Sequence, residues 1–300
     1  MERDQYSRTA LAAAFIRAQH YLHDEPKVIE DPYAHRLLTA VEMAALTERY
    51  LQDGQELGVT ASDRASLLAR TLRLVKPAAF VLARARYTED RLALAIERGV
   101  DQYVLVGAGL DTFAFRRTDL RARVRVFELD HPRSQAFKRE RLAAAGLEPP
   151  SNLQFGSIDF ERESVADALR RLPFDPARPA VFAWLGVTMY LTRTAIESTW
   201  RALRSVAAPG TELVFDFIDP DVLSGTAPPS VQRLRERTRA VGEAIITGLD
   251  PATLAADLQG SGWTLVEQLD GAEIHRRWFA ARDDGYVARP RGHLACAAAR

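Results

Sequence analysis

The chain has 300 residues, enough for one large α/β domain or two modest ones with a substantial buried core. Lysine plus arginine and aspartate plus glutamate both number 40, so the chain has no overall field that would attract nucleic acid or an anionic membrane. A single cysteine, Cys296, excludes an internal disulfide framework and a cysteine-based zinc site.

The N-terminal residues are charged from Glu2 to Asp4 and contain no apolar signal core. No apolar run reaches the roughly 18 residues that a membrane span needs. We therefore expect a cytoplasmic protein with neither a membrane nor a nucleic-acid partner.

Helical periodicity dominates the first third of the chain. Residues 9–22, 34–51 and 65–98 are expected to be helices. Asp31-Pro32 and Gly99 occupy positions usual for a helix start and a helix stop, and Pro77 is expected to break or kink the third helix.

From residue 101 onward, short apolar runs alternate with helical patterns. The expected strands are 102–106, 124–129, 153–158, 180–184 and 212–217, and the expected helices between them are 132–145, 164–172 and 194–207. This alternation predicts a doubly wound, mostly parallel sheet with helices on both faces.

The connection after the fifth expected strand is unusually long. Residues 219–248 include several prolines and a charged helical stretch, 231–244. A connection of this length is more often a lid or a binding loop than a linker. Asp250 and Pro251 are expected to cap and begin another helix, which ends near Gly260 or Gly262.

With two further strands at 263–269 and 293–298, the pattern predicts a Rossmann-like α/β fold with a seven-stranded sheet. We expect a single domain, residues 1–300. Its parts would be an N-terminal helical cap with the first helix (1–99), a ligand-binding core (100–218), a lid insertion (219–248) and a C-terminal helix with the last strands (249–300).

Two strand ends carry the most informative residues. The first run ends in Gly107-Ala108-Gly109, and the next run ends at Asp130. A small-residue turn lets a ligand approach the backbone, and an acid on the neighbouring strand can accept both hydroxyls of a ribose. Gly-x-Gly after a strand is also compatible with a simple tight turn, but together with Asp130 it predicts a nucleoside pocket.

The loop chemistry indicates which nucleoside fits. Thr112 stands where a dinucleotide-binding loop has its third glycine, and Asp111 precedes it. A carboxylate repels a pyrophosphate but not the ammonium and sulfonium of S-adenosylmethionine. The loop therefore favours S-adenosylmethionine over NAD.

Six segments together resemble a known family. They lie at residues 7–10, 31–34, 83–87, 107–112, 127–132 and 184–191. In this order they resemble a class I methyltransferase of the leucine carboxyl methyltransferase type, including its bacterial small-molecule O-methyltransferase relatives. The resemblance spans roughly residues 7 to 217, and the tail matches only in outline.

The resemblance implies S-adenosyl-L-methionine as the cofactor. An arginine before the first strand binds the cofactor carboxylate in this family, which implies Arg86, with Arg84 as the alternative, although both also suit a solvated helix face. Asp130 would hold the ribose. Asp159 would contact the adenine amino group, with Ile158 or Phe160 against the ring. The residues expected around the cofactor are Arg86, Gly107, Ala108, Gly109, Leu129, Asp130, Ile158, Asp159, Phe160 and Trp184.

Other interpretations remain open for some of these residues. Asp159 is equally suited to cap the helix expected near Glu163, and Trp184 suits the core as well as a pocket wall. Glu128 is expected to support the loop or a neighbouring helix.

The sequence departs from the family at Leu185, which precedes Gly186. Eukaryotic members carry a glutamate before a small residue there. The change removes one expected polar contact near the cofactor and favours the bacterial branch.

Methyl transfer is an in-line displacement, so the site must position the acceptor and exclude water. A carboxylate acceptor needs no base, whereas a phenol or alcohol benefits from one. The candidate bases are His20, His23, His131 and His275, and none is distinguished by its sequence surroundings. His20 and His23 share a helix face, but no third ligand accompanies them, so no metal site is predicted.

The leading hypothesis is an O-methyltransferase that methylates a hydroxyl or carboxyl of a small molecule, such as a polyketide-like secondary metabolite. Tyr21 and Tyr190 would contact the acceptor, although Tyr190 also suits packing beneath the lid. The alternatives are methylation of a protein C-terminal carboxylate, a non-catalytic cofactor-binding module and, more distantly, NAD-dependent reduction. An enclosed apolar cavity would favour methylation of a small molecule. An arginine- or lysine-lined slot would favour methylation of a protein C-terminal carboxylate, and a filled cavity would favour the non-catalytic module.

Overall fold

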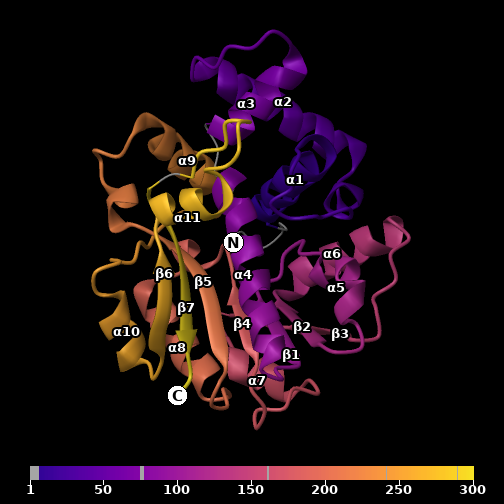
Figure 1. Cartoon of the computed structure of the whole chain (residues 1–300), viewed down its shortest axis with the longest axis vertical. Helices are drawn as coiled ribbons and strands as arrows, with labels where there is room; N and C mark the ends of the chain where they lie inside the picture. The colour runs from indigo at the N-terminus through magenta and orange to yellow at the C-terminus, as the bar shows by residue number, and fades with distance from the viewer. Residues whose placement is uncertain (1–6, 75–77, 161, 241, 289) are drawn as a thin grey trace.

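The computed structural model describes residues 7–74, 78–160, 162–240, 242–288 and 290–300. The kink expected at Pro77 lies outside these ranges. Figure 1 shows a sheet in the lower part of the view, with the N-terminal helices above one end of it. Within the described ranges, no helix combines the length and apolarity that crossing a lipid bilayer requires.

Seven strands form one sheet in the order β3-β2-β1-β4-β5-β7-β6. They are β1 (Gln102–Val106), β2 (Arg125–Asp130), β3 (Leu153–Ser157), β4 (Val181–Trp184), β5 (Glu212–Ile218), β6 (Thr264–Leu269) and β7 (Gly292–Ala298). Strands β1 to β5 pair in parallel, and β7 is antiparallel to both β5 and β6. The predicted seven-stranded, mostly parallel sheet is confirmed, and its strand order reverses between β1 and β4, where ligands bind in such sheets.

Each central strand contributes to two cores on opposite faces of the sheet. In β4, Val181 and Ala183 join one core, while Phe182 and Trp184 join the other. All four side chains are buried. Burial on both faces explains why these strands appear in the sequence as continuous apolar runs rather than as alternating ones.

Helices cover both faces of this sheet. They are α1 (Arg8–His23), α2 (Ala40–Glu56), α3 (Arg64–Leu74), α4 (Ala78–Glu97), α5 (Phe113–Arg116), α6 (Pro132–Ala144), α7 (Val165–Arg170), α8 (Arg193–Arg204), α9 (Pro229–Ala240), α10 (Leu254–Gly260) and α11 (Gly271–Trp278). Short 3-10 helices are η1 (Ala34–Leu37), η2 (Thr118–Leu120), η3 (Thr188–Tyr190) and η4 (Pro220–Leu223). Helices α1 and α4 contribute to the first core, and α7, α8 and α10 to the second.

Some helix boundaries differ from the prediction. The expected helix 34–51 divides into η1 and α2 because Thr39 and Glu42 form a reciprocal capping box. The helix expected to start at Pro251 starts instead at Leu254, because the Asp250 carboxylate accepts the Ala252 amide in a preceding turn. Helix α11 was not predicted.

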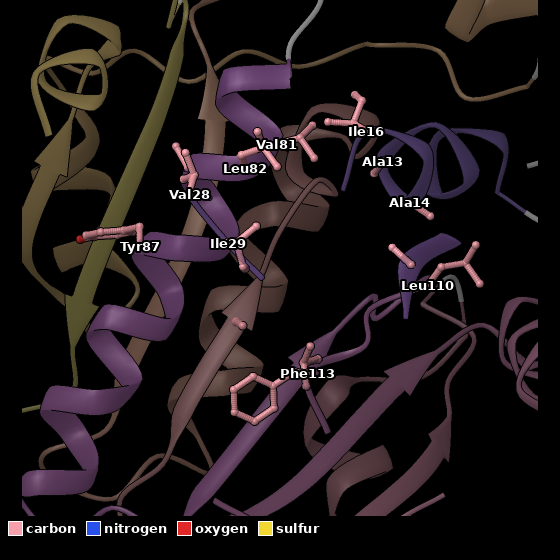
Figure 2. Close-up of a cluster of buried hydrophobic side chains, with 14 of the residues drawn as sticks. Ala13, Ala14, Ile16, Val28, Ile29, Val81, Leu82, Tyr87, Leu110 and Phe113 are labelled. Atoms are coloured by element: carbon pink, nitrogen blue, oxygen red, sulfur yellow. The ribbon is translucent and has the colours of Figure 1, made fainter. Parts of the chain in front are cut away.

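Helix α1 is packed against α4 and against the loop that follows β1. Figure 2 shows Ala13, Ala14 and Ile16 of α1 near Val81 and Leu82 of α4, with Leu110 and Phe113 below them. The Arg17 guanidinium donates to the Asp31 carboxylate at 2.8 Å and to the Leu110 carbonyl at 2.7 Å. The N-terminal helix is therefore attached directly to the predicted nucleoside-binding loop.

A buried carboxylate strengthens this attachment. Asp31 also accepts the Thr112 hydroxyl at 2.7 Å. Burial alone would raise the pKa of Asp31, but the charges of Arg17 and Arg116 lower it below its ordinary value. Asp31 therefore remains ionised at neutral pH and holds the chain before η1 against the loop.

The segment after β5 connects the sheet with the N-terminal helices. It contains η4 and α9, and it is tied to η3, just beyond the central strand β4, because the Ile246 amide donates to the Met189 carbonyl at 2.9 Å. Arg237 of α9 forms an ion pair with the buried Asp53 of α2. Figure 1 shows α9 at the same end of the sheet as α1 to α3.

Candidate active site

The loop after β1 is held by the end of β2. The Leu129 carbonyl accepts the Gly107 amide at 2.8 Å and the Ala108 amide at 3.2 Å. Gly107 has a φ of 74°, and a Cβ there would lie 2.7 Å from Cγ2 of Val187. Gly107 is thus required both by its conformation and by the close approach of the loop after β4.

Gly109 lies beneath the first turn of α1. It has a φ of 51°, and a Cβ on it would lie 3.2 Å from Cβ of Ala10. The glycine loop is therefore covered by the N-terminal helix, and that helix forms one wall of any pocket on the loop.

Asp130 connects the tip of β2 with the glycine loop. Its Oδ2 accepts the Gly109 amide at 2.6 Å, and its Oδ1 accepts the His131 amide at 2.7 Å. Burial raises the pKa of Asp130, and the two amide hydrogen bonds oppose that rise. Since each carboxylate oxygen has two lone pairs, both retain an acceptor position for a ribose hydroxyl.

The structure distinguishes the two candidate arginines on α4. Arg84 donates to the buried Asp216 at 3.1 Å, and its guanidinium lies 2.7 Å from where a Cβ on Gly186 would be. Arg86 is half exposed, pairs with Asp90 at 2.8 Å and donates to the Val28 carbonyl at 3.3 Å. Residues two positions apart, such as Arg84 and Arg86, point about 200° apart around the helix axis, so their side chains cannot enter the same site. Arg84, not Arg86, reaches the carboxyl end of β4.

Asp216 is a site residue that the sequence analysis missed. It is fully buried in β5, and its Oδ1 accepts the Gly186 amide at 2.5 Å while its Oδ2 accepts Arg84. It thereby fixes both the loop after β4 and the guanidinium. An acid between two phenylalanines near the carboxyl end of the strand was the available signal.

The residues expected at the adenine lie just beyond the end of β3. Ile158 is fully buried, Phe160 is half buried, and Asp159 is partly exposed with Arg162 at 3.4 Å. Ser164, not Asp159, caps α7 by accepting the Asp167 amide at 3.2 Å. The cap interpretation of Asp159 is therefore wrong, and its carboxylate stands at the strand end.

Trp184, the last residue of β4, is fully buried in the second core. Its indole Nε1 has no hydrogen-bond partner within the described ranges. Trp184 therefore belongs to the core below the carboxyl ends of the strands, and its indole N–H is a buried donor without a partner among the described residues.

Glu128 supports a neighbouring helix, which is one of the two roles expected for it. The fully buried carboxylate accepts Lys138 of α6 at 2.5 Å. Burial raises the pKa of Glu128 to about 7, although Lys138 acts in the opposite direction. This pair connects β2 with α6 and so anchors that helix.

Tyr190 ends η3, immediately beyond the loop after β4. Its hydroxyl lies in the neighbourhood of the Thr9 side chain. Burial raises its pKa to about 12, and the charge of Glu243 acts in the same direction. The structure thus brings together residues from α1, η3 and the segment after α9 at this hydroxyl.

Tyr21, predicted as an acceptor contact, lies at the end of α1 away from the glycine loop. It stacks on His35 with ring centroids 6.4 Å apart, and Lys27 lies over its ring. Tyr21 is 11 residues beyond Ala10 along α1, which corresponds to roughly 16 Å of helix. Ala10 is the residue that contacts the glycine loop.

Three of the four candidate histidines make contacts that stabilise the fold. His20 accepts the Val28 amide on Nε2 at 2.8 Å and lies 2.7 Å from Asp24 through Nδ1, so neither ring nitrogen is free to act as a base. His131 caps α6, and His275 stacks on Phe279. His23 is exposed. Among the described residues, no group of three or more acidic, histidine or cysteine side chains is arranged to hold a metal ion.

These features define a nucleoside-binding α/β protein of the class I methyltransferase type. A glycine loop follows β1, an acid ends β2, and an arginine fixed by Asp216 reaches the end of β4. Comparison with known proteins agrees. The sequence model of the family described as leucine carboxyl methyltransferase matches residues 10–204.

A curated relative and two solved structures resemble the chain over most of its length. The Bacillus subtilis protein named "Putative S-adenosyl-L-methionine-dependent methyltransferase YktD" is 30% identical over 293 residues, 96% of each chain. A DUF574 family protein from Streptomyces avermitilis has a TM-score of 0.58 at 15% identity, covering 98% of each chain. A "putative methyltransferase" from Thermobifida fusca has a TM-score of 0.54 at 19% identity, covering 85% of this chain and 93% of its own.

The chain therefore belongs to the leucine carboxyl methyltransferase family, and it is an S-adenosyl-L-methionine-dependent methyltransferase. The two structural likenesses support the fold alone. The residues present fit the cofactor, since Asp130 retains acceptor positions for hydroxyls beside the glycine loop. When bound, S-adenosyl-L-methionine supplies an electrophilic methyl group carried on a sulfonium.

Proposed function

We propose that this enzyme is an O-methyltransferase that methylates a small molecule, such as a polyketide-like secondary metabolite. One observation carries the proposal: Thr9, Tyr190 and Glu243 come together from three separate elements beside the cofactor loops. A hydroxyl and a carboxylate at this place suit a small protic acceptor, which they can hold by hydrogen bonds.

The cofactor assignments follow from the same geometry. We propose that the amides of Gly107, Ala108 and Gly109 border the cofactor and that Asp130 binds its ribose. Arg84, next to Gly186, is proposed to bind the cofactor carboxylate in place of Arg86.

At the other end of the cofactor we propose that Asp159 contacts the adenine amino group. Ile158 and Phe160 would pack near the ring, and Trp184 would support them from the core. The carbonyl of Leu129 keeps the glycine loop in place rather than contacting the cofactor.

The cap limits the size of the acceptor. Ala10 lies over Gly109, and the segment after α9 is bound to both Thr9 and the Met189 carbonyl. We propose that α1, α2 and residues 219–248 cover the acceptor. A protein C-terminus would require a cationic slot, whereas the charged groups near Tyr190 are Glu243, Asp216 and the paired Arg84.

Binding and turnover experiments test the proposal separately. Calorimetry with S-adenosyl-L-methionine, S-adenosylhomocysteine and NAD should show binding of the two sulfur nucleosides and none of NAD. Mass spectrometry of a panel of small phenols, alcohols and carboxylic acids should then show a gain of one methyl group. Methylation of a peptide carboxyl terminus, with no small molecule modified, would contradict the proposal.

A further inference from the structure

Thr9 joins the segment after α9 to the first turn of α1. Its backbone amide donates to Oε2 of Glu243 at 3.0 Å, and Ser7 caps the same helix by accepting the Ala10 amide at 3.0 Å. The first turn of α1 has no acidic residue of its own. Glu243, 234 residues away in sequence, supplies the negative charge that a helix N-terminus favours, and it is nine-tenths buried.

Glu243 is brought toward Tyr190 by two contacts, since it accepts the Thr9 amide at 3.0 Å and the nearby Ile246 amide donates at 2.9 Å to the carbonyl of Met189, the residue before Tyr190. The groups that influence the Tyr190 hydroxyl are the carboxylates of Glu243 and Asp216, the guanidinium of Arg84 and the neutral Thr9 side chain. Arg84 and Asp216 pair with each other at 3.1 Å. Among the described residues, the partner shown for Glu243 is a backbone amide and not a cation. The local charge near Tyr190 is therefore negative.

A negative charge in a poorly hydrated position discriminates between acceptors. A carboxylate beside Glu243 would place two like charges together, which is costly where water screens them little. A neutral hydroxyl can donate to Glu243 and accept from Tyr190 at once. The same negative charge attracts a positively charged sulfonium.

We infer that Glu243 forms the acceptor end of the site and selects a neutral hydroxyl over a carboxylate, with Tyr190 as the second contact to that hydroxyl. This inference rests on the proposed methylation of a small molecule and narrows it from hydroxyl or carboxyl to hydroxyl. In the reaction the acceptor oxygen forms a bond to the methyl carbon while the carbon–sulfur bond breaks and its electron pair stays on sulfur. The hydroxyl proton passes to the Glu243 carboxylate and then to water.

The first test measures binding and needs no acceptor. Glu243→Gln keeps the shape and an oxygen for the Thr9 amide but removes the charge. Calorimetry should show S-adenosylhomocysteine binding within about twofold of wild type, whereas the preference for S-adenosyl-L-methionine over S-adenosylhomocysteine falls by roughly threefold or more. Glu243→Asp, which keeps the charge, should retain the preference.

A matched control comes from the same inserted segment. Glu236 lies on the exposed side of α9, so Glu236→Gln removes one carboxylate away from the site. It should leave the binding preference unchanged. If Glu243→Gln also leaves the preference unchanged, the inference is wrong.

The second test measures turnover with a matched acceptor pair, 2-naphthol and 2-naphthoic acid. The wild-type enzyme should methylate the naphthol about tenfold faster or more, and Glu243→Gln should lower the naphthol rate without lowering the acid rate. Faster methylation of the acid by wild type would overturn the inference while leaving small-molecule methylation intact. If S-adenosyl-L-methionine binds but no member of the wider phenol, alcohol and acid panel is methylated, the proposed function fails, and the acceptor role of Glu243 fails with it.

Discussion

The cofactor loops and the cap over them are stabilised in different ways. The glycine loop is held by backbone hydrogen bonds to the end of the adjacent strand, as from Gly107 to Leu129. The cap is held by contacts between residues far apart in the chain, as the Thr9 backbone amide makes with the Glu243 carboxylate and as Asp53 makes with Arg237. The glycine loop is therefore encoded by neighbouring segments of the chain, whereas the cap depends on distant partners and can change without disturbing the loop.

The largest expected effect lies on the cofactor side, in the buried pair of Glu128 and Lys138. Lys138→Met should destabilise the protein by about 3 to 5 kcal/mol, because it leaves the Glu128 carboxylate buried without its cation. Urea unfolding of the variant measures the loss. Replacing both residues together, as Glu128→Leu with Lys138→Met, should restore most of it. A loss below about 1 kcal/mol in the single variant would show that the pair does not anchor α6.

A smaller, pH-dependent effect is expected in the cap. Burial alone would raise the pKa of Asp24, but hydrogen bonds from His20, Arg73 and Tyr286 lower it from 3.8 to about 2. A lowered carboxyl pKa stabilises the fold above the unfolded-state value, and this contribution is lost as pH falls from about 4 toward 2. It amounts to roughly 2 kcal/mol.

Comparison with Asp24→Asn measures this contribution. At pH 7 the variant should unfold at lower urea than wild type, and the difference should narrow as the pH falls through the range from 4 to 2. A difference that does not depend on pH would mean that the ionised carboxylate does not join α1, α3 and the C-terminal tail.

The smallest global effect is expected at the link between α9 and α2. Arg237→Ala removes the ion pair with Asp53, and since Arg237 is partly exposed the midpoint of thermal unfolding should fall by only about 2 °C. Amide hydrogen exchange in α9 and in the residues after it should nevertheless rise several-fold. Arg239→Ala on the exposed side of α9 serves as the control and should leave exchange unchanged. Equal exchange in both variants would refute a role of the pair in holding the insertion.

The sequence was sufficient to predict the sheet, the glycine loop and the position of Asp130 because their signals are short-range. Seven strands, the glycine loop and the position of Asp130 were all predicted, and they depend on apolar runs and turn residues next to one another in the chain. The sequence did not distinguish the surroundings of Arg84 from those of Arg86. Both lie among apolar residues of α4, and only the position of Asp216 in β5 shows that Arg84 is the one held at the end of β4.

The contact between Glu243 and Thr9 was less predictable because its two residues are far apart in the sequence. Glu243 lies in an irregular segment with no periodicity, and its partner Thr9 is at the other end of the chain. Helix α11 was missed because it is short and begins with Gly271, a poor helix former; the Asp270 side chain caps it by accepting the Glu273 amide at 2.8 Å. Long-range pairs of single side chains leave no local pattern in a sequence.

The most direct measurement is calorimetry of S-adenosylhomocysteine binding to wild type and to three variants, Arg84→Ala, Arg86→Ala and Asp130→Ala. The site described here predicts that the Arg84 and Asp130 variants lose tenfold or more in affinity, about 1.4 kcal/mol, because each removes a charged contact to the ligand. Arg86→Ala should bind within about twofold of wild type, since its side chain faces Asp90 and solvent. A tenfold loss in Arg86→Ala with none in Arg84→Ala would contradict the assigned cofactor pocket.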